Sequence, residues 1–195
     1  MKIKLLSTLS IMLLPVAAIA QPLEKNLEKN KVFSQGALVA VNADHCTPKM
    51  KNRPFLLILN KGQSVMPTIE KCATNAKLKG AVLSGGIGGL TNLKLGYYDV
   101  IDKSYNLKTF HKNSYEILSL NGNISTIEKK PGDFVHLHAT MGDQNYNAFG
   151  GHLLSADVSI TTEIMVTPLA ETPVRTFRPA LGFNEITQVK KCIEY

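Results

Sequence analysis

Short apolar and β-branched runs separated by turn residues make up most of the sequence after Arg53. Each run is short and bounded by Gly, Asn, Asp, Ser or Pro, which is typical of β-strands. Since only one other stretch shows helical spacing, the pattern predicts an α+β fold, with a mostly antiparallel sheet or half-barrel packed on one main helix. The expected strands span residues 53–60, 81–86, 91–100, 107–110, 115–125, 134–140 and 159–169, and residues 147–154 should add a strand or a bulged connection.

The single helical stretch follows the first strand. Ser64 and an early Pro67 mark its start, and Gly80 is its predicted end. Its apolar positions recur at helical spacing and predict the face that packs on the sheet. These positions are Met66, Ile69, Cys72, Ala73 and Ala76.

The glycine-rich segment SGGIGGL at 84–90 resembles a phosphate-binding turn only superficially. Its spacing does not fit G-x-G-x-x-G, and a strand is expected to follow it in place of a helix. Close backbone packing or a β-bulge is therefore the favoured interpretation, with anion binding as the alternative.

The first 20 residues have the features of a secretory signal peptide. Lys2 and Lys4 give a basic start, an apolar run follows, and Ala18-Ile19-Ala20 resembles a cleavage site. The apolar run is shorter than the roughly 20 residues needed to span a bilayer. We therefore expect export to the periplasm or the medium without stable membrane insertion. The expected organisation is a signal peptide at 1–20, a polar arm at 21–52, a domain at 53–186 and a tail at 187–195.

The charge of the chain is mildly basic, with a formal net charge of +7. Only Arg53, Arg175 and Arg178 are arginines, whereas proteins that read DNA sequence depend on arginine for base contacts. The excess charge therefore indicates solubility more than nucleic-acid recognition.

The three cysteines are too few and too far apart for a disulfide scaffold or a thiolate zinc motif. Cys72 lies on the apolar side of the predicted helix and is expected to be an inert buried thiol. Cys46 and Cys192 flank the domain. A disulfide between them is one possibility in an oxidising compartment, and free thiols are the other.

Three of the five histidines lie in HLHATMGDQNYNAFGGH at 136–152. In an extended strand His136 and His138 project from the same face, about 6 to 7 Å apart. If the chain reverses around Gln144, His136 lies opposite His152, and this even register puts all three imidazoles on one face. Two neighbouring glycines, at 150 and 151, carry no side chains that would crowd the site.

This arrangement of His136, His138 and His152 predicts a site for a divalent metal ion, with zinc as the first candidate. Histidine nitrogens bind zinc at about 2.0 to 2.1 Å, and three protein ligands leave a fourth position for water or substrate. Nickel, copper, iron and manganese accept the same ligands. The alternative is that each of the three histidines fills a strand position and makes ordinary hydrogen bonds. His45 and His111 have no comparable context and are expected at the surface. The carboxylates considered for orienting the rings are Asp133, Asp143, Glu116 and Glu163.

Several motifs resemble one known family. GAVLSGGIGGLTNLKLGYYD (80–99), YEILSLNGNIS (115–125), HLHATMGDQNYNAFGGHLLSADV (136–158) and TTEIMV (161–166) are similar to the PPC domain, which is conserved between plants and prokaryotes. The resemblance covers about 53–186 and implies a strongly bent antiparallel sheet on a helix, a homotrimer, and metal bound by the three histidines. In plants the domain accompanies AT-hooks, and this chain has no R-G-R-P hook.

The H-L-H…G-G-H arrangement also resembles the zinc site of acetolactate decarboxylases. Those enzymes need further glutamate and arginine residues, for which Glu116, Glu163 and Arg178 are possible stand-ins. The leading hypothesis is therefore an exported, trimeric protein with a metal site that binds or transforms a small molecule. Whether it is an enzyme stays open. The alternatives are a metal-dependent lyase, and an interaction module or DNA-associated protein without catalysis.

Overall fold

The computed structural model describes residues 38–111 and 113–191. The expected signal peptide and the first part of the expected arm lie outside these residues. The compact unit begins at Leu38, ahead of the boundary expected at 53. Among the residues described, no helix has the length and apolar composition needed to cross a membrane.

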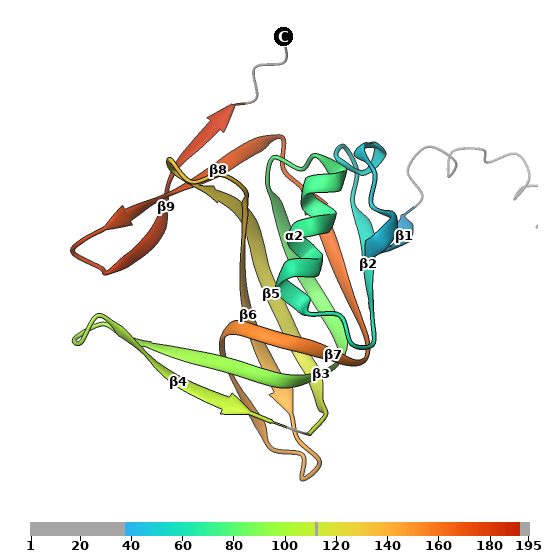
Figure 1. Cartoon of the computed structure of the whole chain (residues 1–195), viewed down its shortest axis with the longest axis vertical. Helices are drawn as coiled ribbons and strands as arrows, with labels where there is room; N and C mark the ends of the chain where they lie inside the picture. Colours follow the sequence, from blue (N-terminus) through green and yellow to red (C-terminus); the bar gives the residue numbers. More distant parts are fainter. Residues whose placement is uncertain (1–37, 112, 192–195) are drawn as a thin grey trace, which may run out of the picture. The chain divides into compact units, whose positions relative to one another are not determined.

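One α-helix and a nine-stranded sheet form this unit (Figure 1). Within the described ranges the strands far outnumber the helical segments, in agreement with the α+β prediction. The elements are β1 (Val39–Asn42), the 3-10 helices η3 (Ala43–His45) and η4 (Pro48–Met50), β2 (Phe55–Asn60), α2 (Val65–Ala76), β3 (Ala81–Asp99), β4 (Ser104–Phe110), β5 (Tyr115–Ile127), β6 (Asp133–Gly142), β7 (Ala148–Pro168), β8 (Glu171–Arg178) and β9 (Phe183–Lys191).

The sheet is mixed and bent. Its main path runs β1-β2-β7-β3-β5-β8-β9, while β4 pairs with β3 and β6 pairs with both β5 and β7. The β1–β2 and β5–β8 pairs are parallel and the others are antiparallel. Because β3 and β7 are long, each pairs with different partners along its length, and the sheet curves around the helix. The finer prediction of a half-barrel stays a prediction.

The long strand β3 joins two segments that the sequence suggested were separate. Its pairing with β7 shifts register between Ser84 and Ile87 and again between Gly88 and Leu90. A Cβ on Gly88 would collide with the backbone of Thr161 on β7. The glycine-rich segment therefore allows bulges and close strand packing, as predicted.

Helix α2 begins after Ser64, as predicted, but ends before Gly80. The chain leaves the helix at Lys77, which adopts a left-handed conformation (φ 54°) and donates its backbone N–H to the carbonyls of Ala73 and Thr74. Gly80 has another role, because a Cβ there would strike the ring of Pro173. The end of the helix was predicted at Gly80 because glycine usually occupies the left-handed position after a helix. Here Lys77 occupies that position.

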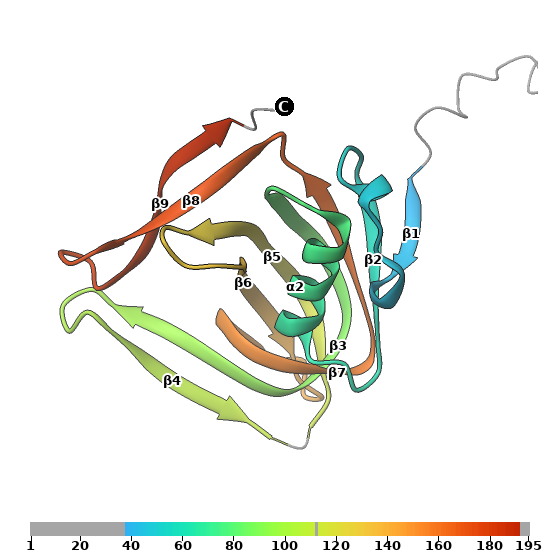
Figure 2. The same ribbon diagram turned by 45° about the horizontal axis from the view of Figure 1, so that its top comes forward.

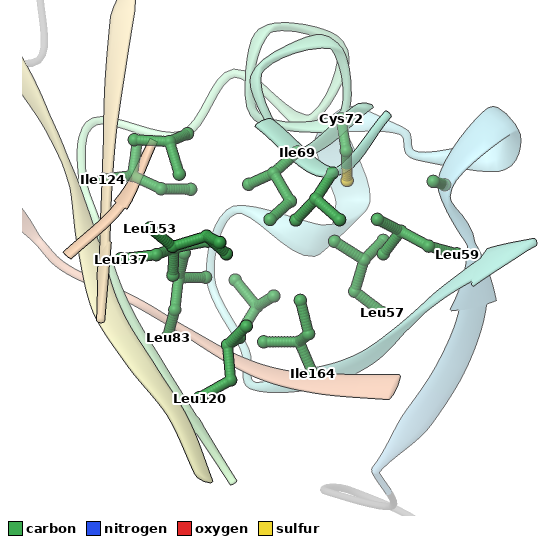
Figure 3. Close-up of a cluster of buried hydrophobic side chains, with 14 of the residues drawn as sticks. Leu57, Leu59, Ile69, Cys72, Leu83, Leu120, Ile124, Leu137, Leu153 and Ile164 are labelled. Atoms are coloured by element: carbon green, nitrogen blue, oxygen red, sulfur yellow. The ribbon is translucent and has the colours of Figure 1, made fainter. Parts of the chain in front are cut away.

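The hydrophobic core lies between α2 and the sheet (Figure 3). Ile69 and Cys72 point from the helix towards Leu57, Leu59 and Ile164 on β2 and β7. Leucine and isoleucine side chains from β3, β5, β6 and β7 complete it, and burying each such side chain contributes about 1.5 to 3 kcal/mol. They are Leu83, Leu120, Ile124, Leu137 and Leu153.

The cysteine predictions were wrong. Cys46 forms a disulfide with Cys72, with a Cα–Cα distance of 5.2 Å. Therefore Cys72 is not a free buried thiol, and Cys46 is not available to Cys192, which lies outside the described residues. The error came from treating 21–52 as an arm. Residues 39–42 instead pair with β2 as a parallel strand, and this pairing brings the following Cys46 next to α2.

Two hairpins extend from the body of the sheet and meet at their tips (Figure 2). One is formed by β3 and β4, and the other by β8 and β9. The Tyr98 hydroxyl donates to the carbonyl of Leu181, and the Tyr98 ring packs edge-on against Phe183 at 5.2 Å between centroids. Residues of both hairpins line one pocket together with residues of β6 and β7.

Candidate metal centre

The three histidines lie on the hairpin formed by β6 and β7. His138 is directly opposite His152 in the antiparallel register. The prediction that His136 would face His152 was therefore off by two residues. The turn is centred on Asn145, because the Asp143 carboxylate accepts hydrogen bonds from the backbone N–H groups of Asn145 and Asn147. A shift of two preserves the side-chain face, so all three rings still lie on one side.

The rings of His136, His138 and His152 converge. Their centroids are 4.8 to 5.2 Å apart, and one potential ligand nitrogen from each ring lies within 4.8 Å of the others. Nε2 of His136 and Nδ1 of His152 are 3.1 Å apart. His136 and His152 are half-buried, whereas His138 is exposed, as are His45 and His111. The cluster therefore has an inner side and a side open to solvent.

Glycines allow the strands around this cluster to approach closely. A Cβ on Gly122 of β5 would strike the carbonyl oxygen of His136, and one on Gly150 would strike the carbonyl oxygen of Ala139. A Cβ on Gly151 would lie 2.8 Å from the Gly96 oxygen. The glycines at 150 and 151 thus serve strand pairing, beyond leaving the site uncrowded.

Arg175 on β8 is the main residue of the site that the sequence did not reveal. It is 5% exposed, and its guanidinium donates from Nε to Ser125 Oγ at 2.8 Å and from Nη1 to the carbonyl of Asn184 at 3.1 Å. Nη2 lies 3.0 Å from Asn123 Oδ1 and 2.9 Å from His136 Nδ1. A buried cation is therefore held directly against the histidine cluster.

This environment disfavours the protonated form of two of the imidazoles. Burial, together with the positive charge of Arg175 and the neighbouring rings, lowers the pKa of His136 from 6.5 to about 4. Burial is also the largest cause that lowers the pKa of His152, followed by the charges of His138 and Arg175. Neutral imidazoles present the lone pairs that metal ions need.

A pocket of about 650 Å³ opens in front of the cluster. The histidines, Arg175 and Asn184 form its polar wall, and among the described residues no aspartate, glutamate or lysine lines it. The ring of Tyr105 lies 5.2 Å from that of His152, between centroids. The aromatic walls come from Tyr97, Tyr98, Tyr105, Phe134, Phe177 and Phe183.

Residues 47–170 match the Plants and Prokaryotes Conserved (PCC) domain family, also abbreviated PPC. The chain belongs to this family. Among solved structures, a PPC protein from Pyrococcus horikoshii is 27% identical, with a TM-score of 0.63, and the match covers 71% of this chain and 94% of that one. A metal-containing protein from Archaeoglobus fulgidus is 31% identical, with a TM-score of 0.63, over 70% of this chain and 94% of that one.

A candidate DNA-binding protein from Bacteroides thetaiotaomicron also has this fold. It is 30% identical, with a TM-score of 0.62, over 67% of this chain and 89% of that one. No curated protein is similar enough to the chain to count as a match.

In this PPC domain the carboxylates considered for orienting the rings lie elsewhere. The Asp133 carboxylate accepts from Thr74 Oγ1 at 3.2 Å, and burial raises its pKa. Asp143 stabilises the β6–β7 turn. Neither Glu116 nor Glu163 lines the pocket. The His136 ring is oriented instead by Arg175, which donates to its Nδ1, while Asn123 on β5 accepts from the same guanidinium group.

Arg178, the arginine considered as a catalytic stand-in, is also outside the pocket. Its Nε lies 2.9 Å from the Glu185 carboxylate in an exposed ion pair. Arg175 and Arg178 are three residues apart on one strand, so their side chains point to opposite faces. Only Arg175 faces the histidines.

The three potential ligands of the cluster are all imidazoles. Imidazole nitrogens suit divalent ions such as zinc, copper, iron and nickel. Ligand nitrogens of a tetrahedral zinc site are about 3.4 Å apart at bond lengths near 2.1 Å. The 3.1 Å pair is close to this spacing, and no pair is more than 4.8 Å apart. The residues present therefore fit the metal that the sequence suggested.

Proposed function

We propose that the protein is an exported PPC-domain protein in which His136, His138 and His152 hold a divalent metal ion, with zinc as the leading candidate. The observation that carries the proposal is the convergence of three imidazole nitrogens on one face of the β6–β7 hairpin. The metal-containing relative from Archaeoglobus fulgidus supports it.

The role of the metal in this proposal is to bind a small molecule in the pocket. Three protein ligands leave an open coordination position on zinc, and His138 lies on the exposed side of the cluster. The pocket of about 650 Å³ in front of the rings is within the range of small-molecule sites. A ligand would contact the open position and the aromatic walls together.

Metal content measured on purified, tag-free protein tests this proposal. After repletion with zinc and removal of excess ion, we expect about one equivalent per chain by elemental analysis. His152→Gln should lower the content several-fold, because one of the three ligands is lost. His111→Gln is the matched control, since His111 is exposed and lies outside the cluster. Less than a tenth of an equivalent in the wild type would contradict the proposal.

Export is supported by the Cys46–Cys72 disulfide, since structural disulfides persist mainly in oxidising compartments. The signal-peptide features of the first 20 residues support the same location. Cell fractionation followed by N-terminal sequencing should find the protein outside the cytoplasm, with a new terminus near Gln21. An intact Met1 on cytoplasmic protein would contradict export.

A homotrimer is the assembly we propose, from the family resemblance. Light scattering at several protein concentrations should then give three times the mass of one processed chain. A monomer mass at all concentrations would remove this part of the proposal.

A metal-dependent lyase is the second candidate, favoured by the pocket beside the cluster. Three tyrosines, Tyr97, Tyr98 and Tyr105, line the pocket and carry hydroxyl groups that could transfer protons. Tyr105 is the nearest candidate, although burial raises the pKa of its hydroxyl. A nucleic-acid role would instead show as DNA affinity that falls steeply between 50 and 200 mM salt.

A further inference from the structure

The guanidinium of Arg175 has no carboxylate partner within the described part of the chain. The salt bridges there join Lys71 to Asp44 and Arg178 to Glu185. Arg175 is instead held by a hydroxyl, an amide oxygen, a backbone carbonyl and an imidazole, all of which are neutral. Burying a cation without a counter-ion is unfavourable, so an anionic ligand in the pocket would offset this cost by supplying the missing charge.

The hydrogen bonds of Arg175 leave part of its guanidinium for a ligand. A guanidinium has five N–H groups and no acceptor. Nε uses its hydrogen on Ser125, Nη2 uses both on Asn123 and His136, and Nη1 uses one on the carbonyl of Asn184. One Nη1 hydrogen therefore has no acceptor among the residues described, while Arg175 lines the pocket.

A second donor becomes available when the histidines act as metal ligands. Arg175 donates to Nδ1 of His136, so the neutral ring carries its proton on Nε2, which faces His152. When Nε2 is a ligand, the neutral ring carries that proton on Nδ1 and no longer accepts from Arg175. The Nη2 group is then free to turn to a ligand in the pocket, where two N–H groups would match the two oxygens of a carboxylate.

We infer that the pocket binds a small organic carboxylate with an apolar or aromatic body, and that Arg175 is the residue that recognises its charge. The inference rests on the proposed function and names the class of ligand for the same site. The aromatic walls suit the body of such a ligand. Among the described residues the wall has a single arginine and no lysine, so the chain itself supplies one permanent positive charge, which matches the single charge of a carboxylate.

Mandelate is a suitable probe because it combines a phenyl ring, a hydroxyl group and a carboxylate. Mandelamide has the same body with a neutral head group, and acetate has the charge without the body. The measured quantity is the ratio of the dissociation constants of mandelamide and mandelate, determined by calorimetry at pH 7.5 and low salt. Protein stripped of metal is used first, so that no cation other than those of the chain contributes to the ratio.

We expect this ratio to be about 10 in the wild type, as for one charge-assisted hydrogen bond in a partly desolvated site. Arg175→Gln should bring it close to 1, Arg175→Lys should give an intermediate ratio, and acetate should bind about 10-fold more weakly than mandelate. Arg178→Gln is the matched control and should leave the ratio unchanged, because Arg178 pairs with Glu185 outside the pocket. Thermal unfolding of each variant verifies that it is folded.

A ratio near 1 in the wild type, or the same ratio in wild type and Arg175→Gln, would overturn the inference. If Arg175→Gln does not fold, Arg175→Lys decides, because it keeps the charge but loses the guanidinium fork. An unchanged ratio in that variant would contradict recognition by the guanidinium group of Arg175. Zinc titration of the same samples is a separate readout. Failure to bind zinc would refute the proposed function, whereas the metal-free ratio decides the role of Arg175.

Discussion

The His136 ring contacts two other residues of the candidate site. Nδ1 accepts a hydrogen bond from Arg175, and Nε2 lies 3.1 Å from His152. Both ring nitrogens are therefore engaged without a metal ion. The pKa of His136 therefore depends on how strongly these neighbours and burial disfavour a positive charge on its ring.

Acid should destabilise the metal-free protein partly through this residue. The folded-state pKa of His136 is about 4, below its ordinary value of 6.5, so between these values the unfolded chain binds more protons than the folded one. The free energy of unfolding should fall as the pH falls from 6.5 to 4. His136→Gln should make this slope shallower, whereas His111→Gln should not. Urea denaturation with chelator at several pH values measures it, and equal slopes in all three proteins would contradict the prediction.

The residues of the site differed in how far sequence could predict them. His136, His138 and His152 were identified because strand alternation and one turn, both local features, place them together. Arg175 was missed because it reaches the cluster through the β5–β8 pairing, which joins segments distant in sequence. Choosing between Arg175 and Arg178 required knowing which face of β8 each side chain occupies.

The β6–β7 hairpin depends on backbone contacts that only glycine permits. Gly150→Ala would place a methyl group against the carbonyl oxygen of Ala139 and push the paired strands apart. We expect a loss of about 1 to 3 kcal/mol in unfolding free energy, together with weaker zinc binding, because His152 would move away from His138. Calorimetry and denaturant unfolding measure the two effects.

Gly142→Ala is the control for this substitution on the same hairpin. The atoms nearest to its Cβ would belong to the Leu118 side chain, at 3.3 to 3.5 Å, and that side chain can move. We expect nearly unchanged stability and zinc affinity. If both alanine variants behaved alike, backbone contact at Gly150 would not be what limits the hairpin.

The disulfide joins Cys46, which directly follows η3, to Cys72 in α2, and it should stabilise the fold. It closes a loop with a sequence separation of 26 residues, for which the chain-entropy relation gives about 3.5 kcal/mol. The double variant Cys46→Ala, Cys72→Ala should lose roughly this much unfolding free energy relative to the oxidised wild type. Reductant should lower the stability of the wild type and leave the variant unchanged. Non-reducing peptide mapping that linked Cys46 to any other cysteine would contradict the assignment.

Sequence predicted the elements better than their connections. The strand at 53–60 and the apolar face of α2 followed from periodicity, which is a local property. The parallel strand β1 did not, because VAVN is short and derives its stability from β2 beside it. Missing β1 led directly to the wrong cysteine pairing.

The candidate site is held together, at the scale of the whole molecule, by segments from most of the sheet. β6 and β7 supply the histidines and β8 supplies Arg175. The β3–β4 and β8–β9 hairpins supply the aromatic walls together with Phe134 of β6. The α+β class was predictable because one helix among many strands is visible in the sequence. The meeting of the two hairpins was not, because it depends on single contacts such as Tyr98 with Leu181.

Since the proposed metal ligands come together only in the folded chain, zinc should stabilise the molecule as a whole. Binding to the folded state alone adds RT ln(1 + [Zn]/Kd) to the unfolding free energy, about 2.7 kcal/mol at a free zinc concentration of 100 times Kd. His138 is exposed and makes no side-chain hydrogen bond among the described residues. Therefore His138→Gln should have nearly wild-type stability in chelator but lose most of the gain on adding zinc.

Unfolding free energies measured in chelator and in zinc distinguish binding by the three histidines from zinc binding elsewhere on the surface. Loss of the gain in His138→Gln, with the full gain in His111→Gln, would assign the stabilisation to the cluster. An equal gain in all three proteins would show that zinc binds elsewhere, and no gain in the wild type would show that the converging imidazoles do not hold it. His138→Gln tests ligation directly, because the exposed side chain of His138 contributes little to packing. If the variant has wild-type unfolding free energy in chelator but gains less on adding zinc, it has lost a ligand.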